Sequence, residues 1–421
     1  MKPKELRISF DETATEGVAM KAELKPCSTS HDIFFRSNDI TLNKTTEALL
    51  SVGLLPAMKT GSTLVADGVI SQKFFHAIDP ICDFYRTLNP SLKKIKIENV
   101  TVEPKGPPKE NRVGIFFSAG VDSFYTFLKH QEEITDLIFI HGFDFSLKSY
   151  SRREKMSKII REIGSHFGKR VVEVETNLRS FVQQSFKKPD LRWAFAHGVV
   201  LASVGHLLFP FFRRIYIPAS YTYANAGIYP LGSHPSLDPL WSTEALEFIH
   251  DGCEATRIEK VALISQSEMA LKTLQVCREN TAVVNDMGPL KNTLFQTGTE
   301  NATSVYNCGL CEKCIRTMIS LHIVGALERC STLPKKLDHK KISQSMIYKK
   351  EDGAFLEDNL KALENRPDDR ELYNALFKVW KQAWWVRIPV KYPKLYRLYQ
   401  IRWIYRILRR LGRLSNKFVG R

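Results

Sequence analysis

The run of small and polar residues at positions 118–123, which we call the phosphate loop, has the composition of a phosphate-binding turn. It reads Ser-Ala-Gly-Val-Asp-Ser and joins an apolar stretch to an apolar helical pattern. A turn from strand to helix offers free backbone N–H groups and the positive end of the helix dipole, which favour an anion. Gly120 would let the backbone approach that anion, and the hydroxyls of Ser118 and Ser123 would add donors. Asp122 could cap the helix or hold Mg²⁺ between phosphates.

Four of the eight cysteines gather in one part of the chain. Cys308, Cys311 and Cys314 follow one another at intervals of three, and Cys277 is the nearest upstream candidate for a fourth ligand. Four thiolates suit a closed tetrahedral Zn²⁺ site, while an iron–sulfur cluster and redox-active or unliganded thiols are the alternatives. Because the first residues lack the apolar run of a secretory signal, we expect a cytoplasmic chain. Clustered cysteines then favour metal or redox chemistry over disulfides.

Two pairs of basic residues lie near the cysteines in the sequence. Arg257 and Lys260 are spaced three apart and could neutralise phosphate charge as an adenylate forms, but a solvated helix face would explain the same spacing. Lys313 and Arg316 could offset the excess negative charge of four thiolates. Arg257 and Lys260, together with Asp122, are our candidate catalytic residues in this part of the chain.

A polar stretch with two prolines, residues 232–243, is the candidate segment for binding a second substrate. It follows a predicted strand, and ligands of open α/β sheets bind beyond the carboxyl ends of strands. We expect His234 and Asp238 to face the substrate, with catalytic roles, and Trp241 to form a stacking wall. A structural loop that buries the tryptophan is the alternative.

From Val113 onward the sequence alternates between strand and helix patterns, which is typical of a parallel sheet with helices on both faces. We expect these strands and helices to position the candidate residues. The uncharged stretch at 194–212 would barely reach across a bilayer, so we favour a buried helix that leads into a strand. The predicted strands cover residues 6–10, 32–35, 94–97, 113–117, 137–140, 171–174 and 215–217, and the predicted helices cover 45–54, 71–88, 155–167, 315–327 and 360–385, with another beginning at 123.

The phosphate loop resembles the Ser-Gly-Gly-x-Asp-Ser signature of the PP-loop ATP pyrophosphatases, a branch of the adenine nucleotide α-hydrolase (HUP) superfamily. Ala119 stands where the signature has its first Gly. A phosphate loop followed by a cysteine cluster is similar to the 7-cyano-7-deazaguanine synthases, in which the cysteines bind structural zinc. The likeness covers residues 112–320. The stretch between Cys277 and Cys308 is longer than the corresponding one in that family.

The resemblance implies a Rossmann-like parallel sheet that binds ATP and Mg²⁺, with Zn²⁺ in the cysteine cluster. Chemistry would occur at the α-phosphate and release AMP and pyrophosphate. The end of the domain's second strand, at His141, would lie near the adenosine, and a satisfied core or rim histidine is the alternative. Nucleotide contacts are expected from Ser118, Ala119, Gly120, Val121, Asp122, Ser123 and His141.

We therefore expect an α/β fold divided into four segments, joined after the first by a Pro- and Gly-rich linker. They are an N-terminal α+β module (1–103), a PP-loop nucleotide-binding domain (112–275), a cysteine-rich zinc segment (276–330) and a helical C-terminal region (331–421).

The net charge of +16 is concentrated at the end of the chain, because residues 387–421 contain 11 Lys and Arg and no Asp or Glu. Leu, Ile and Tyr recur there every three or four residues, which predicts an amphipathic helix with a cationic face. Such a helix could lie on an anionic membrane surface, dock on its own core or grip nucleic acid, and we favour them in that order. We also consider a homodimer.

The function that these expectations favour is an ATP-dependent ligase. It would adenylate a small-molecule carboxylate and transfer the acyl group to ammonia or another amine, a reaction that needs positioning and charge neutralisation rather than a nucleophilic side chain. The alternatives are a sulfurtransferase or RNA-thiolating enzyme, which would need a reactive cysteine such as Cys314, and a non-catalytic nucleotide-binding scaffold at the membrane surface.

Overall fold

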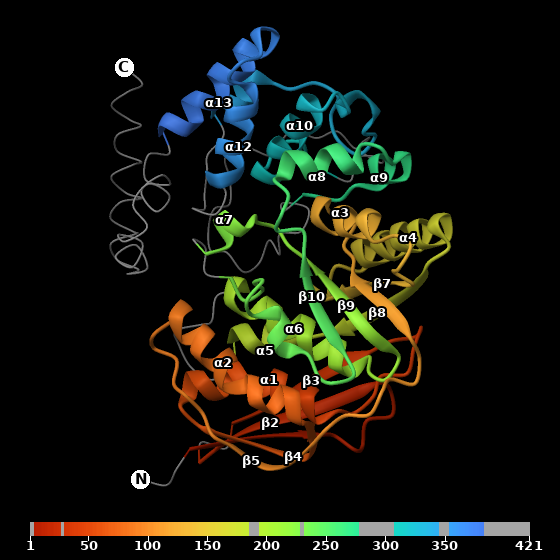
Figure 1. Ribbon diagram of the computed structural model, residues 1–421, viewed down its shortest axis with the longest axis vertical. Helices are drawn as coiled ribbons and strands as arrows, with labels where there is room; N and C mark the ends of the chain where they lie inside the picture. Colours follow the sequence, from red (N-terminus) through yellow and green to blue (C-terminus); the bar gives the residue numbers. More distant parts are fainter. Residues whose placement is uncertain are drawn as a thin grey trace. The chain divides into compact units, whose positions relative to one another are not determined.

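The strands of the described residues form one mixed sheet, in which most neighbours are parallel (Figure 1). The computed structural model describes residues 4–26, 29–184, 193–227, 231–277, 307–344 and 353–382. The ten strands are β1 (Glu5–Phe10), β2 (Val18–Lys25), β3 (Thr29–Arg36), β4 (Thr63–Ser71), β5 (Ile97–Glu103), β6 (Arg112–Phe116), β7 (Asp136–His141), β8 (Arg170–Thr176), β9 (Phe212–Pro218) and β10 (Glu247–Asp251). Their order across the sheet is β10-β9-β6-β7-β8-β3-β2-β1-β4-β5.

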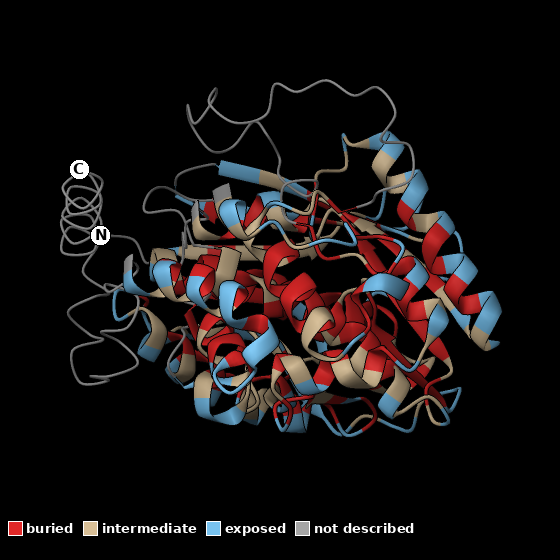
Figure 2. Cartoon of the chain, turned by 90° about the horizontal axis from the view of Figure 1, so that it is seen from above, coloured by how far each residue is buried: buried red, intermediate tan, exposed pale blue. Residues whose placement is uncertain are grey.

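Strands β6 to β10 form the parallel half of this sheet, in the order β8-β7-β6-β9-β10. Every residue of β6 and β7 is buried, and the burial colouring of Figure 2 shows continuous buried strands of this kind. Parallel strands are covered on both faces, so they are apolar along their whole length instead of alternating. The predicted α/β architecture with a parallel sheet is confirmed at this level.

The N-terminal strands continue the same sheet, whereas we expected a separate module over 1–103. Strand β3 pairs antiparallel with β8 through Phe35 opposite Thr176 and Arg36 opposite Glu175. The side-chain amide of Asn177 extends this pairing, because its Oδ1 accepts from the Phe34 N–H at 3.0 Å and its Nδ2 donates to a β3 carbonyl. Ladder hydrogen bonds therefore join the two halves, and the first expected boundary does not divide the sheet.

The chain folds into two compact units that do not follow the expected segments. The first contains residues 1–118, 126–219 and 230–253 and carries the whole sheet. The second contains residues 119–125, 220–229 and 254–421. Residues 254–275, which we assigned to the nucleotide-binding domain, therefore group with the cysteine segment, and so does most of the phosphate loop.

Helices account for most of the remaining described residues. Helix α1 packs on β1 and β4, and α4 packs on β7 and β8. The α-helices are α1 (Thr46–Thr60), α2 (Gln72–Leu88), α3 (Val121–Lys129), α4 (Tyr150–Phe167), α5 (Leu178–Gln184), α6 (Trp193–Leu207), α7 (Tyr223–Ala226), α8 (Arg257–Ile264), α9 (Glu268–Thr273), α10 (Glu312–Ile323), α11 (His339–Gln344), α12 (Gly353–Leu363) and α13 (Arg370–Gln382). The 3-10 helices are η1 (Asp238–Trp241), η3 (Leu327–Arg329) and η5 (Pro367–Asp369).

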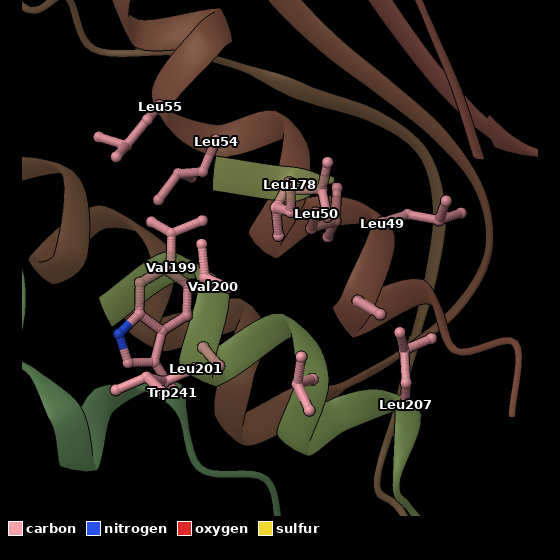
Figure 3. Close-up of a cluster of buried hydrophobic side chains, with 14 of the residues drawn as sticks. Leu49, Leu50, Leu54, Leu55, Leu178, Val199, Val200, Leu201, Leu207 and Trp241 are labelled. Atoms are coloured by element: carbon pink, nitrogen blue, oxygen red, sulfur yellow. The ribbon is translucent and has the colours of Figure 1, made fainter. Parts of the chain in front are cut away.

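The core of the first unit lies where α1 meets α6 (Figure 3). Both helices are buried on nearly all sides, which explains why the 194–212 stretch carries no charge. Helix α6 ends at Leu207 and the chain enters β9, so the prediction of a buried helix followed by a strand is confirmed. Side chains that meet in this cluster include Leu49, Leu50, Leu54, Leu55, Leu178, Val199, Val200, Leu201, Leu207 and Trp241.

A smaller core in the second unit is built from α10, α11, α12 and α13. The single helix that we predicted over 360–385 is wrong: the structure has α12 and α13, separated by η5 at Pro367. Proline has no N–H to donate, so it starts a new helix more readily than it continues one. None of the helices in the described ranges is long and apolar enough to cross a membrane. The basic segment 387–421 lies outside the described residues.

Candidate functional site

The phosphate loop forms the tight turn between β6 and α3 that its sequence predicts. The amide of Phe124 donates to the carbonyl of Gly120 at 2.9 Å, which begins the helix. Gly120 also donates its N–H to the hydroxyl of Ser123 at 3.0 Å, and that hydroxyl lies 3.1 Å from the Gly120 carbonyl. Ala119 has a φ of +55°, a left-handed conformation that costs a residue with a Cβ about 1 kcal/mol or more.

The side chains of the loop divide into inward and outward groups. Ala119, Val121 and Ser123 are buried, whereas Ser118 and Gly120 are partly exposed. Ala119 and Val121 could therefore contact a ligand only through their backbone. The hydroxyl of Ser123 holds the turn together, so the structure gives it a local role beside the predicted donor role.

Asp122 is the acidic centre of the site. Its Oδ1 lies 3.7 Å from Arg257 Nη1 and 3.6 Å from Lys260 Nζ, and its Oδ2 accepts from the Ser220 hydroxyl at 3.1 Å. Burial alone would raise its pKa. The positive charges of Lys260 and Arg257 outweigh that effect and hold the pKa of Asp122 below its ordinary value. The carboxylate is therefore ionised at neutral pH, and its side chain is 24% exposed.

Helix α8 places the two predicted cations on one face. Thr256 caps the helix, with its side chain accepting from the Glu259 N–H while the Glu259 carboxylate accepts from the Thr256 N–H. Arg257 and Lys260 follow at a spacing of three, which puts them one turn apart on the same side. Lys260 is 1% exposed and Arg257 is also buried, so the alternative of a solvated helix face is wrong.

Helix α10 supplies two further cations that sequence reasoning assigned differently. The positive charges of Lys313 and Arg316 also lower the pKa of Asp122, after those of Lys260 and Arg257. Helices α8 and α10 lie side by side (Figure 1), and Arg257 donates to the Thr317 hydroxyl at 2.9 Å. We call Arg257, Lys260, Lys313 and Arg316 the basic cluster.

An aromatic side chain from α12 holds part of the basic cluster in place. The guanidinium carbon of Arg316 lies 3.9 Å from the ring centroid of Phe355, and that of Arg257 lies 5.7 Å from it. Tyr221 stacks on the same ring, with centroids 5.2 Å apart. Arg316 also pairs with Glu312 at 3.0 Å. Cation–π contacts of this kind keep guanidinium groups ordered away from water.

The four cysteines predicted as metal ligands come together in the second unit. Their Sγ atoms all lie within 4.8 Å of one another, and the Cys277–Cys311 and Cys308–Cys314 pairs are both 3.9 Å apart. Tetrahedral coordination by thiolates places sulfurs about 3.8 Å apart. None of the four forms a disulfide among the described residues, and hydrogen bonds with the other cysteines, first with Cys277, raise the pKa of Cys314. The cluster can therefore hold a metal ion, and Cys277 belongs to it.

Asn307 explains how Cys277 reaches the cluster across a long insertion. Its Oδ1 accepts from the N–H groups of Val276 and Cys277 at 2.8 and 3.0 Å. Its Nδ2 donates to the carbonyls of Leu274 and Thr332 at 2.9 and 3.0 Å. Asn307 directly precedes Cys308, so one side chain ties the upstream ligand to the downstream three. We did not identify this residue from the sequence, where only its position beside Cys308 pointed to it.

The segment predicted to face a second substrate is partly buried in the first unit. Trp241 is fully buried against Phe74, with ring centroids 5.9 Å apart, so the stacking wall is wrong and the structural loop is right. Asp238 is also fully buried, so it does not face a substrate here. His234 is partly buried beside the ring of Phe84, and its Nδ1 accepts from the Ser236 N–H.

Asp238 instead pairs with His250, which sequence reasoning missed. His250 Nδ1 lies 2.7 Å from Asp238 Oδ2, and the Ser233 hydroxyl donates to the same oxygen at 2.6 Å. Burial opposes the charged imidazolium, but the hydrogen bond to Asp238 and a second one with Cys253 outweigh it. Together they raise the pKa of His250 to about 9.

His141 lies at the end of β7, as predicted, but it is buried and paired. Its Nε2 lies 2.7 Å from Glu173 Oε2, and the Ser157 hydroxyl donates to the same carboxylate oxygen. These contacts satisfy one ring nitrogen, whereas Nδ1 is buried without a hydrogen-bond partner among the described residues, so the alternative of a satisfied core or rim histidine is met only in part. A contact with adenosine stays a prediction.

Comparisons of the chain with protein-family models, with curated proteins and with solved structures found no match.

Proposed function

We propose that this chain is an ATP-dependent ligase that adenylates a carboxylate and releases AMP and pyrophosphate. The observation that carries the proposal is the convergence of the basic cluster on Asp122 at the start of α3. Four basic side chains act on one carboxylate, and three of them are buried. Four positive charges gathered beside one ionised carboxylate favour the binding of a further anion, and a polyphosphate is such an anion.

The sheet supports the same proposal. Strand β6 lies between β7 and β9, at the point where the strand order reverses, and the phosphate loop follows its carboxyl end. Nucleotides bind at this point in doubly wound α/β folds. The order β8-β7-β6-β9-β10 is the one that a Rossmann-like HUP domain would have. On this basis we assign the phosphate loop to the β- and γ-phosphates of ATP.

The residues present suit the chemistry of adenylation. With ATP bound, Asp122 would hold Mg²⁺ between phosphates, and the basic cluster would neutralise the charge that develops as pyrophosphate leaves. The acceptor carboxylate needs no protein nucleophile, because it attacks the α-phosphorus itself. Four thiols with the observed spacing suit Zn²⁺, which would have a structural role since a closed site has no open position.

A sulfurtransferase would need a thiol that a substrate can reach. Among the described cysteines, those outside the cluster are all buried: they are Cys82, Cys253 and Cys330. Burial, and to a lesser extent the charges of nearby acidic residues, raise the pKa of Cys82 to about 12. This thiol is therefore not nucleophilic at neutral pH. A sulfurtransferase would therefore have to use a cluster cysteine, and thiolates that hold a closed zinc site would not serve as nucleophiles.

The experiment measures the products of ATP. Purified protein is incubated with Mg-ATP, ammonium and a panel of carboxylic acids, and AMP, ADP, pyrophosphate and phosphate are separated by ion-exchange chromatography. We expect AMP and pyrophosphate in equal amounts with at least one acid. We expect Asp122→Asn to reduce this rate on the order of 100-fold or more, because the loss of one electrostatic contact at a reacting centre has effects of this size. The exposed Glu268→Gln, in the same unit, is the matched control and should keep full activity.

Either of two results would contradict the proposal. One is release of ADP and phosphate, which would place the attack at the γ-phosphate. The other is no AMP with any acid although the protein is folded, which would support a nucleotide-binding scaffold instead. Circular dichroism of the Asp122 variant separates a catalytic loss from unfolding.

A further inference from the structure

We propose that the cysteine cluster and the phosphate loop are thermodynamically coupled, so that a metal ion held by the four thiols increases the affinity for the triphosphate. The inference rests on the proposed function, because it takes the phosphate loop as the triphosphate site. It goes beyond a stabilising role for the metal: it makes Gln275 a positioning residue, and it makes the placement of Lys313 and Arg316 depend on the metal.

The first connection runs through the backbone before Cys277. The N–H of Gln275 donates to the carbonyl of Ala119 at 2.8 Å. Gln275 lies two residues before a metal ligand, and Asn307 fixes the residues between them. A left-handed alanine persists only where its surroundings hold it. The segment that bears Cys277 is part of those surroundings, so the metal site helps to hold the loop in its anion-binding conformation.

The second connection runs through α10. Cys311 is the N-cap of this helix and Cys314 lies in its first turn. Lys313 and Arg316 lie within two residues of a cysteine ligand, and their charges act on Asp122. Two ligands one turn apart would fix the direction of a helix end that otherwise frays. A bound metal therefore sets where these two cations stand relative to the loop.

The neighbouring helix transmits the same constraint. Arg257 donates to the Thr317 hydroxyl, and Thr317 in turn donates to the carbonyl of Lys313 at 2.7 Å. Phe355 receives the guanidinium groups of both Arg257 and Arg316. A shift of the first turn of α10 would therefore move the α8 cation as well. The basic cluster is one packed group whose position depends on the metal-bearing turn.

Coupling between two sites must be reciprocal, which supplies two independent measurements. Isothermal titration of the full chain with Mg-ATP and with pyrophosphate compares the zinc-loaded protein with protein treated with a chelator and desalted. Couplings between sites in proteins usually change affinity by about 5- to 150-fold, and we expect a loss of about tenfold here. In the reverse direction, saturating Mg-ATP should raise the affinity for zinc by the same factor, so less zinc is released to a chromogenic chelator at equilibrium, measured with Mg²⁺ in excess.

Variants of α10 separate coupling from simple stabilisation. Lys313→Gln combined with Arg316→Gln keeps all four cysteines, so zinc content and zinc release without nucleotide should stay as in the unmodified protein. Binding of Mg-ATP should weaken, and saturating Mg-ATP should no longer reduce the amount of zinc released to the chelator at equilibrium. Lys272→Gln, on the exposed side of α9 in the same unit, removes a charge elsewhere and should change none of these quantities.

The outcomes also distinguish this inference from the ligase proposal. An unchanged ATP affinity in folded, zinc-free protein would overturn the coupling. If zinc-free protein unfolds, the equilibrium release experiment decides, and a zinc affinity that does not change with Mg-ATP would overturn the coupling. AMP formation without coupling would remove only this inference, whereas coupling without AMP formation would remove only the ligase.

Discussion

Ala119 shows how a single residue in the phosphate loop carries a conformational cost. Its φ of +55° lies in the region that glycine tolerates best, and the family signature that the loop resembles has glycine there. The amide of Gln275 holds the carbonyl of Ala119, so the turn keeps its shape despite the methyl group. A substitution at this position should therefore change the free energy of unfolding without changing the conformation of the loop.

We predict that Ala119→Gly stabilises the protein slightly. Relief of the left-handed strain is worth about 1–2 kcal/mol, and the extra freedom of glycine in the unfolded chain removes about 0.4–1 kcal/mol of that gain. The control is Ala262→Gly inside α8, where glycine should cost about 1 kcal/mol. Urea denaturation of both variants should therefore give shifts of opposite sign. A destabilised Ala119 variant would show that the buried methyl group contributes more by packing than it costs.

Individual site residues were predictable from the sequence where their spacing is local. The loop residues and Cys308, Cys311 and Cys314 lie within short motifs, and the structure brings the three thiols together. The roles of Asn307 and Phe355 depend on contacts between segments far apart in the sequence, which no local pattern encodes. Composition gave the wrong expectation at 232–243, because a polar stretch suits both an exposed loop and a buried loop whose polar groups are hydrogen-bonded.

At the scale of elements, the 231–241 loop is fixed between β10 and α6. The His250–Asp238 pair joins β10 to η1. On the other side, the N–H of Gly232 donates to the Ala194 carbonyl at 2.7 Å. A Cβ on Gly198 would overlap the carbonyl oxygen of Gly232, so the close approach requires glycine. The loop is thus a structural component of the first unit.

We predict that the His250–Asp238 pair makes stability fall as the pH rises. The pKa of His250 is about 9 in the folded protein and about 6.5 in an unfolded chain, so the folded state holds the extra proton between these values. The pair's contribution, roughly 3 kcal/mol from this shift, is fully present below pH 6.5 and lost as the pH passes 9. Urea midpoints between pH 6 and pH 10 should fall more steeply for the native protein than for His250→Gln. Parallel profiles would contradict this account.

Sequence patterns placed many elements because their periodicity is local. The helices at 45–54 and 71–88 correspond to α1 and α2, and Ser71 caps α2. The strand expected at 94–97 is in fact β5 at Ile97–Glu103, because short alternation does not fix a strand's register. The pairing of β3 with β8 was not predictable, since pairing between distant strands leaves no local pattern.

At the scale of the whole molecule, the two compact units cross the segments that the sequence suggested. Most of the phosphate loop belongs to the same unit as the cysteine segment. From the sequence we had predicted a boundary after residue 275, between a nucleotide-binding domain and a zinc segment. The unit that contains the loop also contains every member of the basic cluster. Composition changes along the chain could not reveal this. Residues 119–125 and 220–229 are short stretches that belong to the second unit but are flanked in the sequence by residues of the first.

The partners expected at the scale of the whole molecule are still predictions. The amphipathic pattern at 387–421 and the expected membrane, self-docking or nucleic-acid contacts concern residues outside the described ranges. A homodimer is likewise a prediction. The ligase proposal depends on none of them, because it is argued from the sheet and the basic cluster, which lie within the described residues.

The most direct test of the central claim is a crystal structure of the full chain with Mg²⁺ and α,β-methylene ATP, an analogue that cannot release pyrophosphate. We predict that its two outer phosphates contact the backbone of the phosphate loop, with Lys260 and Arg257 beside them and the α-phosphorus open to an acceptor. An empty loop at saturating analogue, or nucleotide bound elsewhere on the chain, would contradict the account.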